Sequence, residues 1–137
     1  MINTYFFPQS GKSGTSTSRS TSGSEPLTDQ QAIEWTGPII VGGQNFIIDF
    51  DTGSSDLWVP SVHCKTNCGG KHKYNPAKSK TSKHLNGNFT IKYGDGSTVE
   101  GSEYSDTVSV GEIEVTGQHL AAADVLSSMF QGSPEDG

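Results

Sequence analysis

The residues best suited to chemistry lie in one segment, FDTGSSDLWVP, from Phe50 to Pro60. Asp51 follows an apolar run, and the hydroxyls of Thr52 and Ser54 are suited to orient a carboxylate or donate to it, which favours its ionised form. Gly53 allows a tight turn and the close approach of another chain, because any Cβ there would intrude. Asp51 is therefore the candidate reactive group.

The elements that position Asp51 are predicted to be strands. From Trp35 onward, short runs rich in Ile, Val, Phe and Thr are broken by Gly, Pro, Asn or Asp, and no helical period is sustained. Residues 39–41 and 46–50 flank Gly42-Gly43, a pair suited to a tight hairpin turn. Alternation then places Phe46, Ile48 and Phe50 on one face and Ile47, Asp49 and Asp51 on the other.

Two more hairpins are predicted after residue 88. Residues 89–93 lead through Gly94-Asp95-Gly96 into residues 97–99, which places Tyr93 at a hairpin tip. Residues 108–110 meet 113–115 across Gly111-Glu112, where glycine in the first central position suits a type II′ turn. We expect an antiparallel meander with its longest strands after residue 97.

Composition separates the chain into two parts. The apolar fraction of 31% is low for a folded chain of 137 residues, and the run from Ser10 to Glu25 reads as a flexible Gly/Ser linker. Folding is expected to begin near Ile33. The net charge of −6 argues against nucleic acid or anionic membrane as the main partner. Between Leu57 and Gly94 there are no acidic residues, and the lysines there predict solvated loops: Lys65, Lys71, Lys73, Lys78, Lys80, Lys83 and Lys92.

No apolar run approaches the ~20 residues of a membrane span, and the opening MINTYFF lacks the features of a signal peptide. Cys64 and Cys68 suit a small disulfide loop in an exported protein, although a reduced pair fits equally well. Asn88-Phe89-Thr90 is an N-glycosylation sequon, usable only in an exported chain. His84 and His119 are expected at the surface.

The segment DTGSSDLWVPS resembles the first active-site segment of pepsin-like aspartic endopeptidases, peptidase family A1, particularly the secreted fungal kind. YNPAKSKTS, IKYGDGSTVEG and FQGSPEDG extend the resemblance over residues 34–137. It implies an all-β fold, a pepsin-like half-barrel of mostly antiparallel strands, here an incomplete N-terminal lobe over residues 35–137. Residues 1–34 resemble a low-complexity linker at the end of a propeptide.

The resemblance implies an enzyme that cleaves polypeptide substrates at acid pH. In such proteases each of two lobes supplies one aspartate, and the pair shares one proton and activates a water molecule. Asp51 would be one catalytic member, supported by Thr52, Gly53 and Ser54. No cofactor and no metal are implied, and the location would be secreted or vacuolar.

The same resemblance assigns roles to the hairpin around Tyr93. Tyr93, Gly94 and Asp95 match the flap that closes over substrate, and the Trp58 indole N–H would hold the Tyr93 phenol in place. Cys64 and Cys68 match the family's disulfide. The competing zinc interpretation, with His63 and His72 as further ligands, is disfavoured because C-x3-C is an uncommon zinc spacing.

Three departures from the family pattern affect the prediction. The turn after Gly42 is two residues shorter, which would shift strand register locally. The sequence stops before the apolar-apolar-Gly strand expected after Gly137, and it has no second Asp-Thr-Gly, since Val108 follows Asp106-Thr107. The chain alone is therefore expected to be inactive and to need a C-terminal lobe with the second aspartate. The alternatives are a retropepsin-like homodimer and a noncatalytic peptide-binding remnant.

Overall fold

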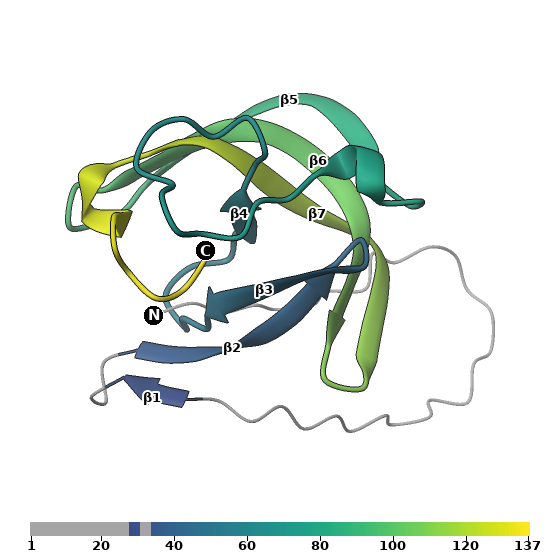
Figure 1. Ribbon diagram of the computed structural model, residues 1–137, viewed down its shortest axis with the longest axis horizontal. Coiled ribbons are helices and arrows are strands. Elements are labelled where there is room, and N and C mark those ends of the chain that lie inside the picture. Colours follow the sequence, from purple (N-terminus) through teal and green to yellow (C-terminus); the bar gives the residue numbers. More distant parts are fainter. Residues whose placement is uncertain (1–27, 31–33) are drawn as a thin grey trace.

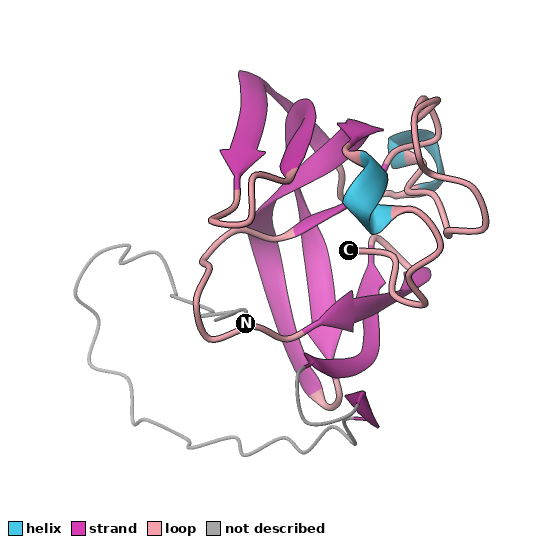
Figure 2. Cartoon of the chain, turned by 90° about the vertical axis from the view of Figure 1, so that its left-hand side faces the viewer, coloured by secondary structure: helices cyan, strands magenta, loops and turns pink. Residues whose placement is uncertain are grey.

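The computed structural model describes residues 28–30 and 34–137, and it confirms the all-β prediction (Figure 1). Two single-turn 3₁₀ helices accompany the strands and lie to one side of them (Figure 2). In chain order the elements are β1 (Thr28–Gln30), β2 (Glu34–Val41), β3 (Gln44–Asp49), β4 (Trp58–Pro60), η1 (Pro76–Lys78), β5 (Lys83–Lys92), β6 (Thr98–Val110), β7 (Ile113–Leu126) and η2 (Ser128–Phe130).

The strands form one mixed sheet in the order β1-β2-β6-β7-β4, with β3 paired to β2 and β5 paired to β6. The long β6–β7 hairpin is the largest pairing, as expected for strands after residue 97 (Figure 1). The predicted antiparallel meander is incomplete, because β2 also pairs with β6 and β4 runs parallel to β7. These two pairings join segments that are distant in the sequence, and no turn signal marks them.

The three predicted hairpins are all present. Gly42 and Gly43 have φ of +54° and +78°, the left-handed region that a two-residue turn of this kind requires. The β2–β3 register runs unbroken from Thr36 opposite Asp49 to Val41 opposite Gln44, so the short turn leaves this pairing continuous. Across the β6–β7 turn, Val110 faces Ile113 and Gly111 has φ of +55°.

The sheet separates two apolar clusters, and alternation along β7 distributes its alanines between them. Ala122 belongs to the first cluster, whereas Ala121 and Ala123 belong to the second. The first cluster also contains Ile39, Val41, Phe46, Ile48, Leu57, Val59, Tyr74, Val108 and Leu120. The second contains Trp58, Cys64, Cys68, Val99 and Leu126, with Phe89, Ile91, Tyr93 and Phe130 packed against it.

Sheet pairing extends to the N-terminal side of the predicted boundary at residue 35. Thr28–Gln30 pair with β2 inside the range predicted to be linker, while the Gly/Ser run from Ser10 to Glu25 lies outside the described residues. Over residues 28–30 and 34–137, no helix has the length and apolar character needed to cross a membrane.

Candidate active site

Asp51 lies just beyond the end of β3, at the wall of a cleft. The strand buries Phe46 and Ile48 in the first cluster, and Phe50 packs against it, as the alternation predicted. Asp51 is 7% exposed, and the backbone N–H of Gly53 donates to its Oδ1 at 2.9 Å.

The two hydroxyls beside Asp51 are placed differently. Thr52 is exposed, whereas the Oγ of Ser54 is buried and has no hydrogen-bond partner within the described part of the chain. Support of Asp51 by Thr52 and Ser54 stays a prediction, while Gly53 contributes through its backbone amide.

The cleft has a volume of about 210 Å³ and is lined by residues from five parts of the chain. The end of β3 and the following loop contribute acidic groups, and the β5–β6 hairpin closes one side. The lining residues are Asp49, Asp51, Trp58, Lys71, Tyr93, Asp95, Ser97, Phe130, Glu135 and Gly137.

The β5–β6 hairpin tip is held by its own backbone and by Asp95. Tyr93 N–H donates to the Ser97 carbonyl at 2.9 Å and Gly96 N–H donates to the Tyr93 carbonyl at 3.0 Å. Asp95 Oδ1 accepts from the Ser97 hydroxyl at 2.6 Å and from the Ser97 amide at 2.8 Å. These hydrogen bonds lower the pKa of Asp95, so the tip carries a negative charge.

Tyr93 is held at the cleft by the hydrogen bond that the family resemblance implied. Trp58 Nε1 donates to the Tyr93 hydroxyl at 2.8 Å. Phe130 packs edge-on against both rings, with centroid separations of 5.3 Å to Trp58 and 5.9 Å to Tyr93. Burial raises the pKa of Tyr93, which keeps its phenol protonated.

Three further charged residues line the cleft, and they were not predicted as site residues. Burial raises the pKa of Asp49, and the charge of Glu135 adds to this effect. Burial lowers the pKa of Lys71, whose Nζ donates to the Ser133 hydroxyl at 3.0 Å and to the Glu135 carbonyl. Lys71 is half-buried, whereas a solvated loop lysine was expected at this position. Only Asp49, on the same strand face as Asp51, carried a sequence signal.

Residues 135–137 reach the cleft because Asp136 anchors them to β3. The Asp136 carboxylate is buried and accepts from the backbone amides of Ile47 at 2.8 Å and His72 at 2.7 Å. The His72 ring contacts the same carboxylate at 3.0 Å. The Asp49 amide donates in turn to the Gly137 carbonyl at 2.9 Å.

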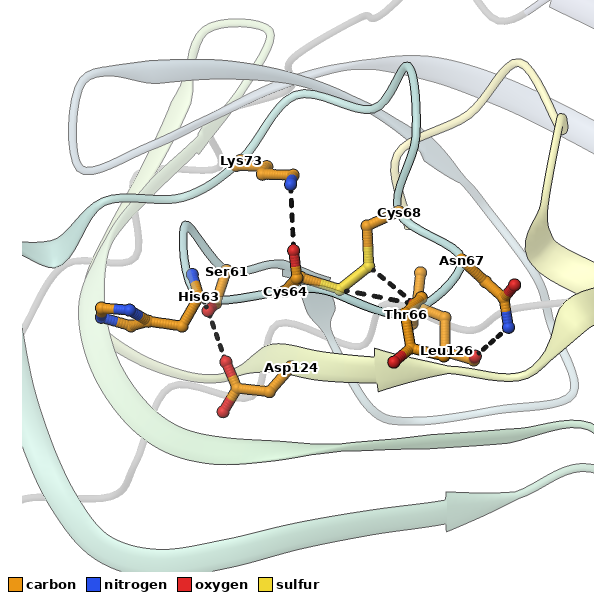
Figure 3. Close-up of a disulfide and its surroundings, with 9 residues drawn as sticks. All are labelled: Ser61, His63, Cys64, Thr66, Asn67, Cys68, Lys73, Asp124 and Leu126. Atoms are coloured by element: carbon orange, nitrogen blue, oxygen red, sulfur yellow. Dashed lines mark hydrogen bonds between the residues drawn. A yellow bond between two sulfur atoms is a disulfide. The ribbon is translucent and has the colours of Figure 1, made fainter.

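Cys64 and Cys68 form a disulfide, as predicted, in a loop attached to β7 (Figure 3). Asn67 Nδ2 donates to the Leu126 carbonyl at 2.7 Å, and the Ser61 hydroxyl donates to Asp124. Bonded sulfurs do not bind zinc as thiolates, and the described residues hold no group of three or more potential metal ligands. The zinc interpretation is therefore not supported.

Comparison with known proteins identifies the family of this site. A sequence profile described as "Eukaryotic aspartyl protease" matches residues 34–137. The chain belongs to the eukaryotic aspartyl protease family. It is 45% identical over 122 residues to an aspartic protease of Phaffia rhodozyma, covering 88% of this chain and 30% of that protein. It is 40% identical over 133 residues to syncephapepsin of Syncephalastrum racemosum, covering 95% and 33%.

A third fungal relative in the aspartyl protease family is rhizopuspepsin-2 of Rhizopus niveus. It is 43% identical over 129 residues, covering 91% of this chain and 33% of the relative. The chain thus spans about a third of the length of the curated relatives it matches.

The structure brings together four of the residues that the family resemblance assigned to the site. Asp51, Trp58, Tyr93 and Asp95 line the cleft together. Gly94 is exposed at the hairpin tip, and Thr52 is exposed and outside the lining.

Proposed function

We propose that this chain supplies half of the active site of an aspartic endopeptidase, with Asp51 as one of the two catalytic carboxylates. The observation that carries the proposal is the position of Asp51: the carboxylate stands in the cleft wall, held by the Gly53 amide, with Tyr93 and Asp95 lining the same cleft. A second lobe would supply the other carboxylate, because the sequence contains one Asp-Thr-Gly and no Asp-Ser-Gly.

Two close carboxylates cannot both be ionised, so the proposed pair shares one proton. One carboxylate acts as base toward a water molecule, and the protonated partner donates to the scissile carbonyl as charge develops on its oxygen. The apparent pKa values belong to the pair, and activity is expected at acid pH.

The hairpin tip would act as a flap over an extended polypeptide substrate. Its backbone N–H and C=O groups that are not paired within the hairpin are suited to pair with a peptide. The Trp58–Tyr93 hydrogen bond would fix the position of the tip relative to the cleft. The disulfide fits an oxidising compartment, in keeping with a secreted or vacuolar enzyme.

The test is a chimera in which this chain replaces the matching third of rhizopuspepsin-2, with cleavage of a quenched fluorescent peptide measured across acid pH. Asp51→Asn should lower kcat by about 10²- to 10⁴-fold, the usual contribution of a positioned acid or base. Asp56→Asn is the matched control, because Asp56 is exposed and lies outside the cleft lining.

Full activity in Asp51→Asn, or equal loss in Asp56→Asn, would contradict the proposal. The chain without a second lobe is expected to be inactive. Cleavage by it in proportion to the square of its concentration would instead indicate a homodimer. A well-folded chimera that binds peptide without cleaving it would indicate a noncatalytic binding module.

A further inference from the structure

The sequon Asn88-Phe89-Thr90 lies on the outer face of β5. Exposure alternates along this strand, with even-numbered residues from 84 to 92 exposed and odd-numbered residues from 85 to 91 partly buried. Phe89 and Ile91 pack against the second apolar cluster, on the side that holds Tyr93. Asn88 and Thr90 therefore point together away from the cleft.

Both polar side chains of the sequon are accessible. Asn88 and Thr90 are exposed, and neither side chain makes a hydrogen bond within the part of the chain that the structure describes. β5 pairs only with β6 among the described strands, so its other edge is open. The β5–β6 register is irregular between His84 and Asn88, which marks a bend in the strand just before the sequon.

The surface next to Asn88 has room for a bulky group. Asn88 and Thr90 border a shallow depression whose rim includes Glu100, Asp124 and Val125. Val125 is 41% exposed although it is apolar. A sugar chain that begins at Asn88 would lie over this depression and beside the open edge of β5, an edge that otherwise invites pairing with another chain.

We propose that Asn88 carries an N-linked oligosaccharide. The proposal rests on the export included in the proposed function, because N-glycosylation takes place in the secretory pathway. It is the one sequon in the 137 residues, and its asparagine and threonine are both outward-facing. The attached sugars shield the β5 edge and leave the cleft open on the opposite face.

The transfer requires a lipid-pyrophosphate-linked oligosaccharide as donor. A bond forms between Asn88 Nδ2 and C1 of the first sugar, while the bond between C1 and the pyrophosphate oxygen breaks. The lipid pyrophosphate leaves with the bonding electron pair, and the proton lost from Nδ2 passes to solvent. The Thr90 hydroxyl completes the recognition sequence, because the sequon requires a hydroxyl residue at that position.

The test is translation of the full 137-residue chain behind an added signal sequence in the presence of microsomal membranes. Translocated chains are identified by their protection from added protease. These chains should show one upward step in gel mobility that an amidase specific for N-linked glycans reverses, with Asn88 converted to Asp in the mass spectrum. Because the signal sequence imposes translocation, the result is independent of whether the natural protein is a protease.

Four variants make the test specific to this sequon. Asn88→Gln and Thr90→Ala should abolish the mobility step, whereas Thr90→Ser and Asn86→Gln should keep it. Asn86 is the matched control because it is exposed on the same face of β5. A protected wild-type chain without the step, or a step that persists in Asn88→Gln, would overturn the proposal. Asn88→Gln should leave peptide cleavage by the chimera unchanged.

Discussion

Asp51 and Asp106 are both buried aspartates followed by threonine, yet their surroundings differ completely. Asp51 lines the cleft and is 7% exposed. Asp106 is 0% exposed and lies within β6. Four donors surround it: the hydroxyls of Tyr74 at 2.6 Å, Thr81 at 2.6 Å and Ser79 at 2.8 Å, and the backbone amide of Thr107 at 2.8 Å.

The two carboxylates differ in their surroundings: Asp106 is enclosed by hydrogen-bond donors within the fold, whereas Asp51 lines the cleft. Burial raises the pKa of Asp106, but the hydrogen bonds from Thr81, Tyr74, Ser79 and Thr107 outweigh burial and bring the pKa below its ordinary value. Both of its oxygens accept hydrogen bonds from groups within the fold. The chain turns at Gly53 after Asp51, whereas Val108 continues β6 into the first cluster after Asp106. The residue after each Asp-Thr pair therefore differs in setting: Gly53 lies in the turn beyond β3, whereas Val108 is buried within β6.

Replacing Asp106 should have the largest effect on stability. Asp106→Ala removes the acceptor of three hydroxyls and leaves the buried Tyr74 hydroxyl without its 2.6 Å partner, which should cost about 3 kcal/mol in the free energy of unfolding. Asp51→Asn should change that free energy by less than about 1 kcal/mol, because the carboxamide keeps an oxygen to accept the Gly53 amide. Urea unfolding measures both values.

The exposed Glu112 in the β6–β7 turn supplies the control for this comparison. Glu112→Ala should stay within about 0.5 kcal/mol of the parent chain. If Asp106→Ala unfolds at the same urea concentration as Glu112→Ala, then the hydrogen bonds to Asp106 do not stabilise the fold.

The pH dependence of stability should depend on Asp106. Its folded-state pKa lies below the unfolded value, so its contribution is fully present above the unfolded pKa and is lost as pH falls through the folded pKa. The parent chain should lose stability as the pH falls below the ordinary aspartate range, and Asp106→Asn should lose less over that window. Urea midpoints from neutral to strongly acid pH measure the difference. Parallel curves for the two chains would contradict the assignment.

A smaller effect is expected on the cleft side, at the Trp58–Tyr93 hydrogen bond. Tyr93→Phe removes the acceptor of the indole N–H but keeps the ring that packs against Phe130. The loss of about 1 kcal/mol should speed amide exchange of Gly96 about fivefold by local opening of the hairpin. Tyr104→Phe is the control, because the Tyr104 hydroxyl makes no hydrogen bond in residues 28–30 and 34–137. Equal exchange in the two variants would show that the bond does not order the tip.

The sequence predicted those features of the fold that depend on local alternation and on turn residues. The Gly42-Gly43 turn, the face shared by Phe46 and Ile48, and the tip at Tyr93 all follow from neighbouring residues. The network around Asp106 was not predicted, because its three hydroxyl donors lie 25 to 32 positions away in a loop without a repeating pattern. The burial of Lys71 was not predicted for the same reason. It depends on residues 133–137, which are distant in the sequence and form backbone hydrogen bonds with β3.

The smallest effect is expected at Asp136, a third buried carboxylate. The question there is whether the His72 ring or the backbone amide donors hold the carboxylate in place. His72 contacts it at 3.0 Å, but the His72 side chain is 71% exposed, and a pair of that kind contributes little. His72→Ala should therefore lower the free energy of unfolding by less than about 0.5 kcal/mol, because the Ile47 and His72 backbone amides still donate to the carboxylate. Asp136→Ala, which removes the acceptor, should cost more in the same urea titration. A loss above about 1 kcal/mol in His72→Ala would mean that the ring holds Asp136, and would separate this carboxylate from Asp106.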